Sequence, residues 1–276
     1  MTGTDLVNYE QQWADAAQRA AKAEPPPQGQ FFSIKGGTLS LGEIQMPGNQ
    51  ACVIILDSVR ENNLYDGKYV EGENMPPICY AYGRDGGEMA PHDSMRPYVE
   101  QGTDANPSYF KPQHFPCTGC WANEWGSADQ GRGKACQERR RLAMIPAGMY
   151  SPRSKSRDFD LTPFDDPAHY ADASVGFLRL PVTSVQGWAK YLHQISSMMH
   201  RPPHGVITHV EVVPDPKSQY KVVFECLGLV PDELARVIMD RNAALEQMPF
   251  TGYQPPEVIK EQRQAGALAG LRRPGA

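Results

Sequence analysis

The chain has 276 residues, of which 40% are hydrophobic, and a formal net charge of −5. This length suits one elaborated domain or two small ones. The 25 prolines and 25 glycines indicate many turns and short strands and disfavour a long helical bundle. No apolar run approaches the roughly 20 residues of a membrane span, and the first residues lack the basic and apolar regions of a signal peptide. We therefore expect a cytoplasmic protein without a membrane partner.

The first segment is expected to be an arm. In residues 5–23 the apolar side chains recur at helical spacing, which predicts a helix. Three prolines at positions 25–27 then end it and form a stiff linker. Residues 1–28 are therefore interpreted as an N-terminal helical arm with a Pro linker, which either packs on the body or docks a partner.

The middle of the chain alternates between short strands and loops. Residues 31–44 predict two strands joined by a turn, and residues 51–60 and 78–83 predict two more. Residues 84–135 are polar, rich in Gly and Pro and without periodicity, which favours an insert held by something other than a core of its own. Strand character returns at 140–145, and 150–173 is expected to be loop.

The last third is the most regular part. Residues 175–182 predict a strand, and a helix follows in which Thr183 and Gln186 have the spacing of a capping box. Trp188 lies on the apolar stripe of that helix and is assigned to the core. Residues 204–215 and 218–228 predict a hairpin that turns at 214–218, and a second helix is expected at 231–248.

This order of elements predicts a β-rich α+β fold, because parallel βαβ repetition is absent. A five- or six-stranded OB-like barrel with flanking helices fits the number of strands. We place this core at residues 29–248, interrupted by a zinc-bound, loop-rich insert at 79–136. Residues 249–276 are rich in Pro, Gly and Ala and are expected to form a flexible C-terminal tail.

The six cysteines divide into two groups. Cys52 and Cys226 lie within apolar strand patterns and are expected as buried core thiols. The other four surround the insert, and two of them form a C-x2-C pair, whose short reach suits a single tetrahedral metal. The predicted metal ligands are Cys79, Cys117, Cys120 and Cys136. Four thiolates favour a structural Zn2+ ahead of an iron–sulfur cluster, with His114 and His92 as reserve ligands.

The same region carries the positive charge of the protein. Residues 111–157 hold nine Lys/Arg against three Asp/Glu, whereas residues 1–110 hold seven against fifteen. Basic residues interleaved with tryptophans suit single-stranded nucleic acid, because cations hold phosphates and flat rings stack on unpaired bases. The predicted nucleic-acid-binding residues are Trp121, Trp125, Arg132, Lys134, Arg139, Arg140 and Arg141. The alternative for the two tryptophans is that they cover the metal site.

Catalytic motifs are weak. The segment around Lys134 fails the P-loop pattern, because Ala128 replaces the first glycine and Ala135 the final Ser or Thr. Asp57, Asp66 and Lys68 faintly suggest a metal-dependent nuclease. We therefore expect a binding protein and no enzymatic activity, with the nuclease as the remote alternative.

One string of residues carries a resemblance. C-x-x-C-x-x-N-x-W-G-S, then G-x-G-K-A-C and R-R-x-L-A, covers residues 76–146 and resembles proteins that accompany replication genes in tailed phages. More loosely, the layout is similar to the zinc-containing single-stranded DNA-binding proteins of T-even-like phages, which combine an OB-fold with a zinc insert. The resemblance implies a single-stranded DNA-binding protein of phage DNA replication or recombination in the host cytoplasm, with replication or recombination proteins as partners. The alternative is a zinc-stabilised strand-annealing or duplex-DNA-binding regulatory protein.

Overall fold

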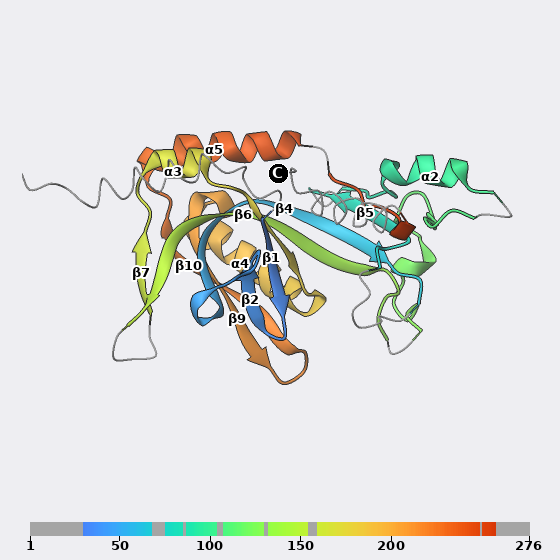
Figure 1. The fold of residues 1–276 in the computed structure, drawn as a ribbon, viewed down its shortest axis with the longest axis horizontal. Coiled ribbons are helices and arrows are strands. Elements are labelled where there is room, and N and C mark those ends of the chain that lie inside the picture. Colours follow the sequence, from blue (N-terminus) through green and yellow to red (C-terminus); the bar gives the residue numbers. More distant parts are fainter. Residues whose placement is uncertain are drawn as a thin grey trace, which may run out of the picture.

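The structure is a computed structural model (Figure 1). It describes residues 30–67, 75–84, 87–103, 107–129, 132–153, 159–248 and 250–257. The helix and Pro linker expected before residue 29 lie outside these residues, as does most of the expected C-terminal tail.

The described strands form one open, mostly antiparallel sheet. They are β1 (Gln30–Lys35), β2 (Thr38–Leu41), β3 (Ile44–Gln45), β4 (Gln50–Leu64), β5 (Cys79–Gly83), β6 (Gln137–Pro152), β7 (Phe159–Pro163), β8 (Gly176–Leu180), β9 (Val206–Asp215) and β10 (Gln219–Leu229). Their order is β10-β9-β4-β6-β8-β1-β2-β3, while β5 pairs with β4 and β7 with β6. Only β1 and β8 are paired in parallel among the described strands. The two long central strands, β4 and β6, therefore each pair with three other strands and connect the two halves of the sheet.

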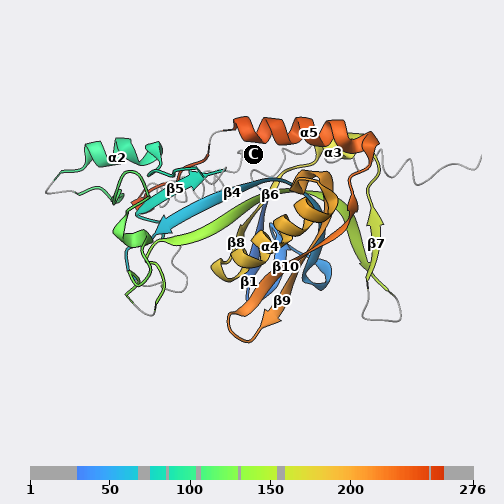
Figure 2. The ribbon, with the colours of Figure 1, turned by 180° about the vertical axis from the view of Figure 1, so that it is seen from behind.

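One face of the sheet curls around the helix α4 (Val182–Met199) (Figures 1 and 2). Trp188, Tyr191 and Ile195 of this helix are buried against apolar residues of β1, β2, β9 and β10. Trp188 is 1% exposed, which confirms its assignment to the core. The helical period of 3.6 residues explains the stripe, because positions three and four apart face the same side.

The opposite face is covered by α3 (Pro167–Asp172) and α5 (Asp232–Gln247), so the body has three layers (Figure 1). Leu234, Ile238 and Leu245 of α5 bury their side chains against β4 and β6 in a second core. Cys52 belongs to this core and is buried as expected. Cys226 is only half-buried, with its Sγ 3.4 Å from Sδ of Met199.

Beyond these layers β4 and β6 continue and carry β5, the short helix α2 (Arg96–Gln101) and the cysteine-rich insert (Figure 2). A third core lies here. The expectation that the insert lacks a core of its own is wrong, because Met95, Phe110 and Ala122 are each 1% exposed. Side-chain burial therefore packs this part of the insert against β4 and β5.

The predicted strands and hairpin are confirmed, and the β-rich α+β class with them. The loop expected at 150–173 is wrong in part, because β7 pairs with the end of β6 and α3 follows. The capping box is also wrong: α4 begins at Val182, and no side chain caps it. The OB-like barrel is not confirmed. The described strands follow an open path, although β2 curls round to approach β9.

Candidate functional site

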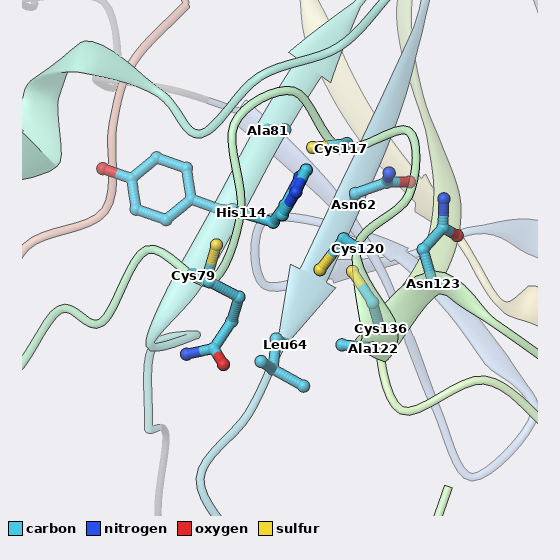
Figure 3. A pocket seen from close by; sticks show the side chains of 12 residues that line it. Asn62, Leu64, Cys79, Ala81, His114, Cys117, Cys120, Ala122, Asn123 and Cys136 are labelled. Carbon is cyan, nitrogen blue, oxygen red and sulfur yellow. The ribbon is translucent and has the colours of Figure 1, made fainter. Parts of the chain in front are cut away.

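The four cysteines predicted as ligands line one small cavity, although they come from three separate segments (Figure 3). Cys79 is the first residue of β5, and Cys136 immediately precedes β6. Cys117 and Cys120 lie on the loop between them in sequence. The register of β5 and β6 on either side of β4 accounts for this arrangement, because both strands begin near the same end of β4.

Backbone bonds hold the cysteine loop in place. Cys120 N donates to Cys117 O at 3.2 Å, so residues 117–120 form a tight turn. Gly119 has a φ of +81° in this turn, a conformation that glycine adopts without strain. Cys136 N donates to Ala122 O at 2.7 Å and thereby ties the third segment to the turn. The C-x2-C spacing is thus realised as a rigid turn that aims both thiols at the cavity.

The electrostatics of the cluster are those of crowded, buried thiols. Burial, together with the charges of the other three cysteines, raises the pKa of Cys136 to about 12. Burial likewise raises the pKa of Cys117 to about 11, with Cys79 and Cys120 adding to the effect. A thiolate at one of these positions disfavours a second one beside it, so without a cation Cys117 and Cys136 are protonated at neutral pH.

Two hydrogen bonds act in the opposite direction. The Asn62 side chain bonds to Cys117, and the backbone of Gln113 bonds to Cys79, and each bond lowers the pKa of its cysteine. Donors aimed at sulfur favour the thiolate, which is the form that binds metal. In the arrangement described, however, no group of three or more His, Cys, Asp or Glu side chains among the described residues is placed to hold a metal ion. The donor set fits zinc in its chemistry, and binding would require the thiols to close on the ion.

Of the two reserve histidines, only His114 lines this cavity. Its Nδ1 lies 2.6 Å from the carbonyl oxygen of Pro116, so Nδ1 is the donor in this contact. His92 lies elsewhere: its ring stacks on Tyr80, and its Nδ1 bonds to Ser94. The structure thus brings one histidine to the four cysteines and not the other.

The two predicted stacking tryptophans are exposed. The side chain of Trp125 is 80% exposed and that of Trp121 is 53% exposed, so neither buries its ring over the cysteines. Lys134 Nζ lies 5.8 Å from the centre of the Trp125 ring and donates to Asn123 Oδ1 at 3.0 Å. Arg132 is exposed on the same insert. An aromatic face beside one cation, Lys134, is therefore available to solvent.

The three arginines at the start of β6 point in two directions, as strand alternation requires. Arg140 pairs with Glu138 at 3.0 Å on the same strand. Arg141, on the other face, donates to the fully buried Glu61 at 2.8 Å. Arg139 donates from Nη2 to Gln137 at 2.5 Å, while its buried Nε has no partner among the described residues. The basic run is thus divided: Arg132 and Lys134 lie on the insert, where Lys134 bonds to Asn123, and the three arginines are engaged on the sheet.

The residues of the nuclease alternative are not brought together. Asp57 lies within β4 and binds Arg84 at 3.0 Å, whereas Asp66 lies beyond the end of the strand and pairs with Lys111. Seven of the nine steps between them run along extended β4, which alone separates the two positions by roughly 20 Å. Lys68 lies outside the described residues. No paired-carboxylate site arises from this set.

Sequence reasoning missed a buried polar cluster on the face of the sheet opposite the cysteines. Glu61 of β4 accepts from Arg141 and from Tyr253 Oη, and it pairs with Arg179 Nε at 3.2 Å. These residues come from β4, β6, β8 and the C-terminal segment. A signal was available in the charged pair Arg60–Glu61, which continues a strand that begins with the apolar run 51–56, because a charge within such a strand needs a partner if it is buried.

Comparison of the chain with known protein families, with curated proteins and with solved structures gave no match. Within the described residues, none of the helices has the length and apolar character needed to cross a membrane.

Proposed function

We propose that this protein binds single-stranded DNA without catalysing a reaction, and that a structural zinc ion stabilises the insert that carries the binding surface. The observation that carries the proposal is the exposed ring of Trp125 beside Lys134. Leaving a large apolar ring in water is unfavourable, and a ring next to a cation suits an unpaired base and its phosphate. Trp121 and Arg132 extend this surface across the same insert.

The zinc ion is proposed to be held by Cys79, Cys117, Cys120 and Cys136, with His114 beside them. Four protein ligands close the coordination sphere, so the metal would hold the fold rather than activate water. Its positive charge would reverse the mutual destabilisation of the four thiolates. The hydrogen bonds from Asn62 and Gln113 support this assignment, since metal-bound sulfurs are commonly oriented by such donors.

The cellular role follows only from the resemblance of residues 76–146. We propose DNA replication or recombination in a tailed phage, in the host cytoplasm, with proteins of those processes as partners. The OB-like barrel belongs to the same proposal, and the approach of β2 to β9 is what supports it. A strand-annealing or duplex-binding regulatory protein is the alternative, which the following experiment separates.

Tryptophan fluorescence should be titrated with a single-stranded oligonucleotide and with the matching duplex, at two salt concentrations. The proposal expects quenching by the single strand at lower concentration than by the duplex, with an affinity that falls as salt rises. Equal or tighter binding of the duplex would support the regulatory alternative. Rapid pairing of complementary strands would support annealing, and the absence of salt-sensitive binding to either DNA would overturn the proposed function.

A further inference from the structure

A cavity of about 650 Å³ lies on the face of the sheet opposite the cysteines. Its floor is formed by Val59, Arg141 and Ala143 of the two central strands. The cysteine cavity lies on the other face, because Asn62, which lines it, and Glu61, which pairs with Arg141, are neighbours on β4 and face opposite sides. The walls come from the start of β1, from β8, from the end of α5 and from the C-terminal segment. A volume of this size is typical of small-molecule sites.

The C-terminal segment is fixed as a wall by three hydrogen bonds. Tyr82 Oη donates to Thr251 O at 3.2 Å, Tyr253 N donates to Tyr80 Oη at 3.1 Å, and Tyr98 Oη donates to Gln254 at 2.8 Å. The ring of Phe250 packs 5.0 Å from that of Tyr82. The cavity is therefore preformed by ordered contacts.

The cavity carries surplus positive charge. Arg84 is matched by Asp57, but Arg141 and Arg179 share the single carboxylate of Glu61. These three arginines and two carboxylates sum to a net charge of +1. Glu61 is fully buried, so the unmatched charge is presented from the two guanidinium groups on the cavity side.

The guanidinium groups keep donors for a ligand. Arg141 contacts Glu61 and Tyr82 through Nη2 alone, and Arg179 uses Nε and Nη2. Among the described residues, Nε and Nη1 of Arg141 and Nη1 of Arg179 have no hydrogen-bond acceptor. Glu61 holds both side chains in place, which prepares these donors for an anion such as phosphate.

Aromatic rings line the remaining space. Phe31 is 58% exposed and lies 6.0 Å from Phe177, centre to centre, on one side. Tyr253 stands on the other side, with its ring 5.4 Å from the guanidinium carbon of Arg179. A purely apolar ligand would leave the surplus charge unpaired, and a small inorganic anion would leave the rings in water. A planar ring joined to a phosphate satisfies both.

We propose that this cavity binds a nucleotide, with the phosphate on Arg141 and Arg179 and the base against the aromatic walls. The nucleotide is either a free mononucleotide or one unit of a single strand, since both present the same chemistry. The site is separate from the surface of Trp121 and Trp125, so the proposal stands or falls on its own measurements.

Isothermal titration calorimetry of the full chain should compare the four deoxynucleoside monophosphates with thymidine and with inorganic phosphate. At least one monophosphate should bind saturably, and about tenfold or more tighter than thymidine or phosphate alone. Arg179→Gln should weaken that binding about tenfold or more, whereas Arg140→Gln, its control on the opposite face, should not. Phe31→Leu removes one aromatic ring from the cavity wall and should also weaken binding of the monophosphate. Phe31 is exposed, so this change should leave the fold intact.

Binding of a single-stranded oligonucleotide distinguishes a free mononucleotide from one unit of a strand. If the monophosphate displaces the oligonucleotide, and Arg179→Gln and Phe31→Leu weaken its binding, the cavity holds a unit of the strand. If the monophosphate binds but neither substitution changes the affinity for the oligonucleotide, the cavity holds a free nucleotide. If no monophosphate binds and neither change affects the oligonucleotide, the inference is overturned. Trp125→Ala then still tests the proposed function separately.

Discussion

The side chain of Asn62 hydrogen-bonds to Cys117, although β4 carries one residue and the insert carries the other. Asn62 Oδ1 has no partner among the described residues, so the amide nitrogen is the donor toward sulfur. The bond opposes the effect of burial on the Cys117 thiol. The bond also connects β4 to the cysteine turn. Asn62 therefore orients Cys117, a role that the spacing of the cysteines does not indicate.

Asn62→Leu should therefore weaken zinc binding by about 10- to 100-fold, as is usual when a group that orients a metal ligand is lost. Competition with a chromophoric chelator would measure this. Asn62→Ser, which keeps a donor hydroxyl, should retain more of the affinity. Equal zinc affinity in both variants and the unchanged protein would show that the hydrogen bond has no role in metal binding.

Elemental analysis should find about one zinc per chain, as a four-ligand site requires. Cys117→Ser and Cys120→Ser should each lose the metal and expose the insert to protease, while Cys226→Ser, outside the cluster, should keep both properties. Iron with labile sulfide in place of zinc would indicate a cluster instead. A metal-free protein whose unfolding temperature is unaffected by chelator would contradict the structural role.

Changing Trp125 to Ala should weaken binding of single-stranded DNA by about 1–3 kcal/mol, the usual contribution of one stacked base. The slope of log affinity against log salt should stay the same, because stacking releases no counterions. Arg132→Ala and Lys134→Ala should instead flatten the slope, by about 0.7 for each phosphate contact removed. A Trp125→Ala protein with full affinity would contradict the stacking assignment.

Arg141→Met should destabilise the fold even without DNA. Burial opposes the charged guanidinium, but the charges and hydrogen bonds of Glu61 and Tyr82 together outweigh burial and raise the pKa of Arg141. Removing the partner leaves Glu61 buried with Arg179 alone, and we expect a loss of about 3 kcal/mol in the free energy of unfolding. Arg140→Met, whose partner Glu138 reaches solvent, should cost about 1 kcal/mol or less. Urea denaturation of both variants makes the comparison, and equal stabilities would contradict it.

Gly252→Ala should loosen the C-terminal segment. A Cβ at this position would meet Ser94 and would lie 2.7 Å from Tyr80 Oη, so the segment must move away from β5. Overpacking of this kind costs about 1–3 kcal/mol. Gly228→Ala is the matched control, because nothing lies within 4 Å of its Cβ. Limited proteolysis should cleave the first variant faster after residue 248 and leave the control unchanged.

Local patterns were sufficient for much of this protein. Short apolar runs predicted the strands around Cys52 and Leu142. Helical spacing assigned Trp188 to the core, because a period of 3.6 residues reports which face of a helix is buried. The C-x2-C spacing and the third cysteine predicted which thiols would meet. The strands and the helix stripe depend on a few adjacent residues, and the cysteine set depends on residue type and spacing, so the sequence by itself determined them.

Only the tertiary structure decided how the charges are used. The run Arg139–Arg141 is uniform in sequence, yet the pleat sends Arg140 to one face and Arg141 to a carboxylate on a neighbouring strand. The partners Glu61, Arg179 and Tyr253 are distant along the chain, and no local period relates them. Strand pairing brings them together, because register across a sheet is set by the whole set of buried faces and not by any one segment. The cavity above Glu61 exists for the same reason.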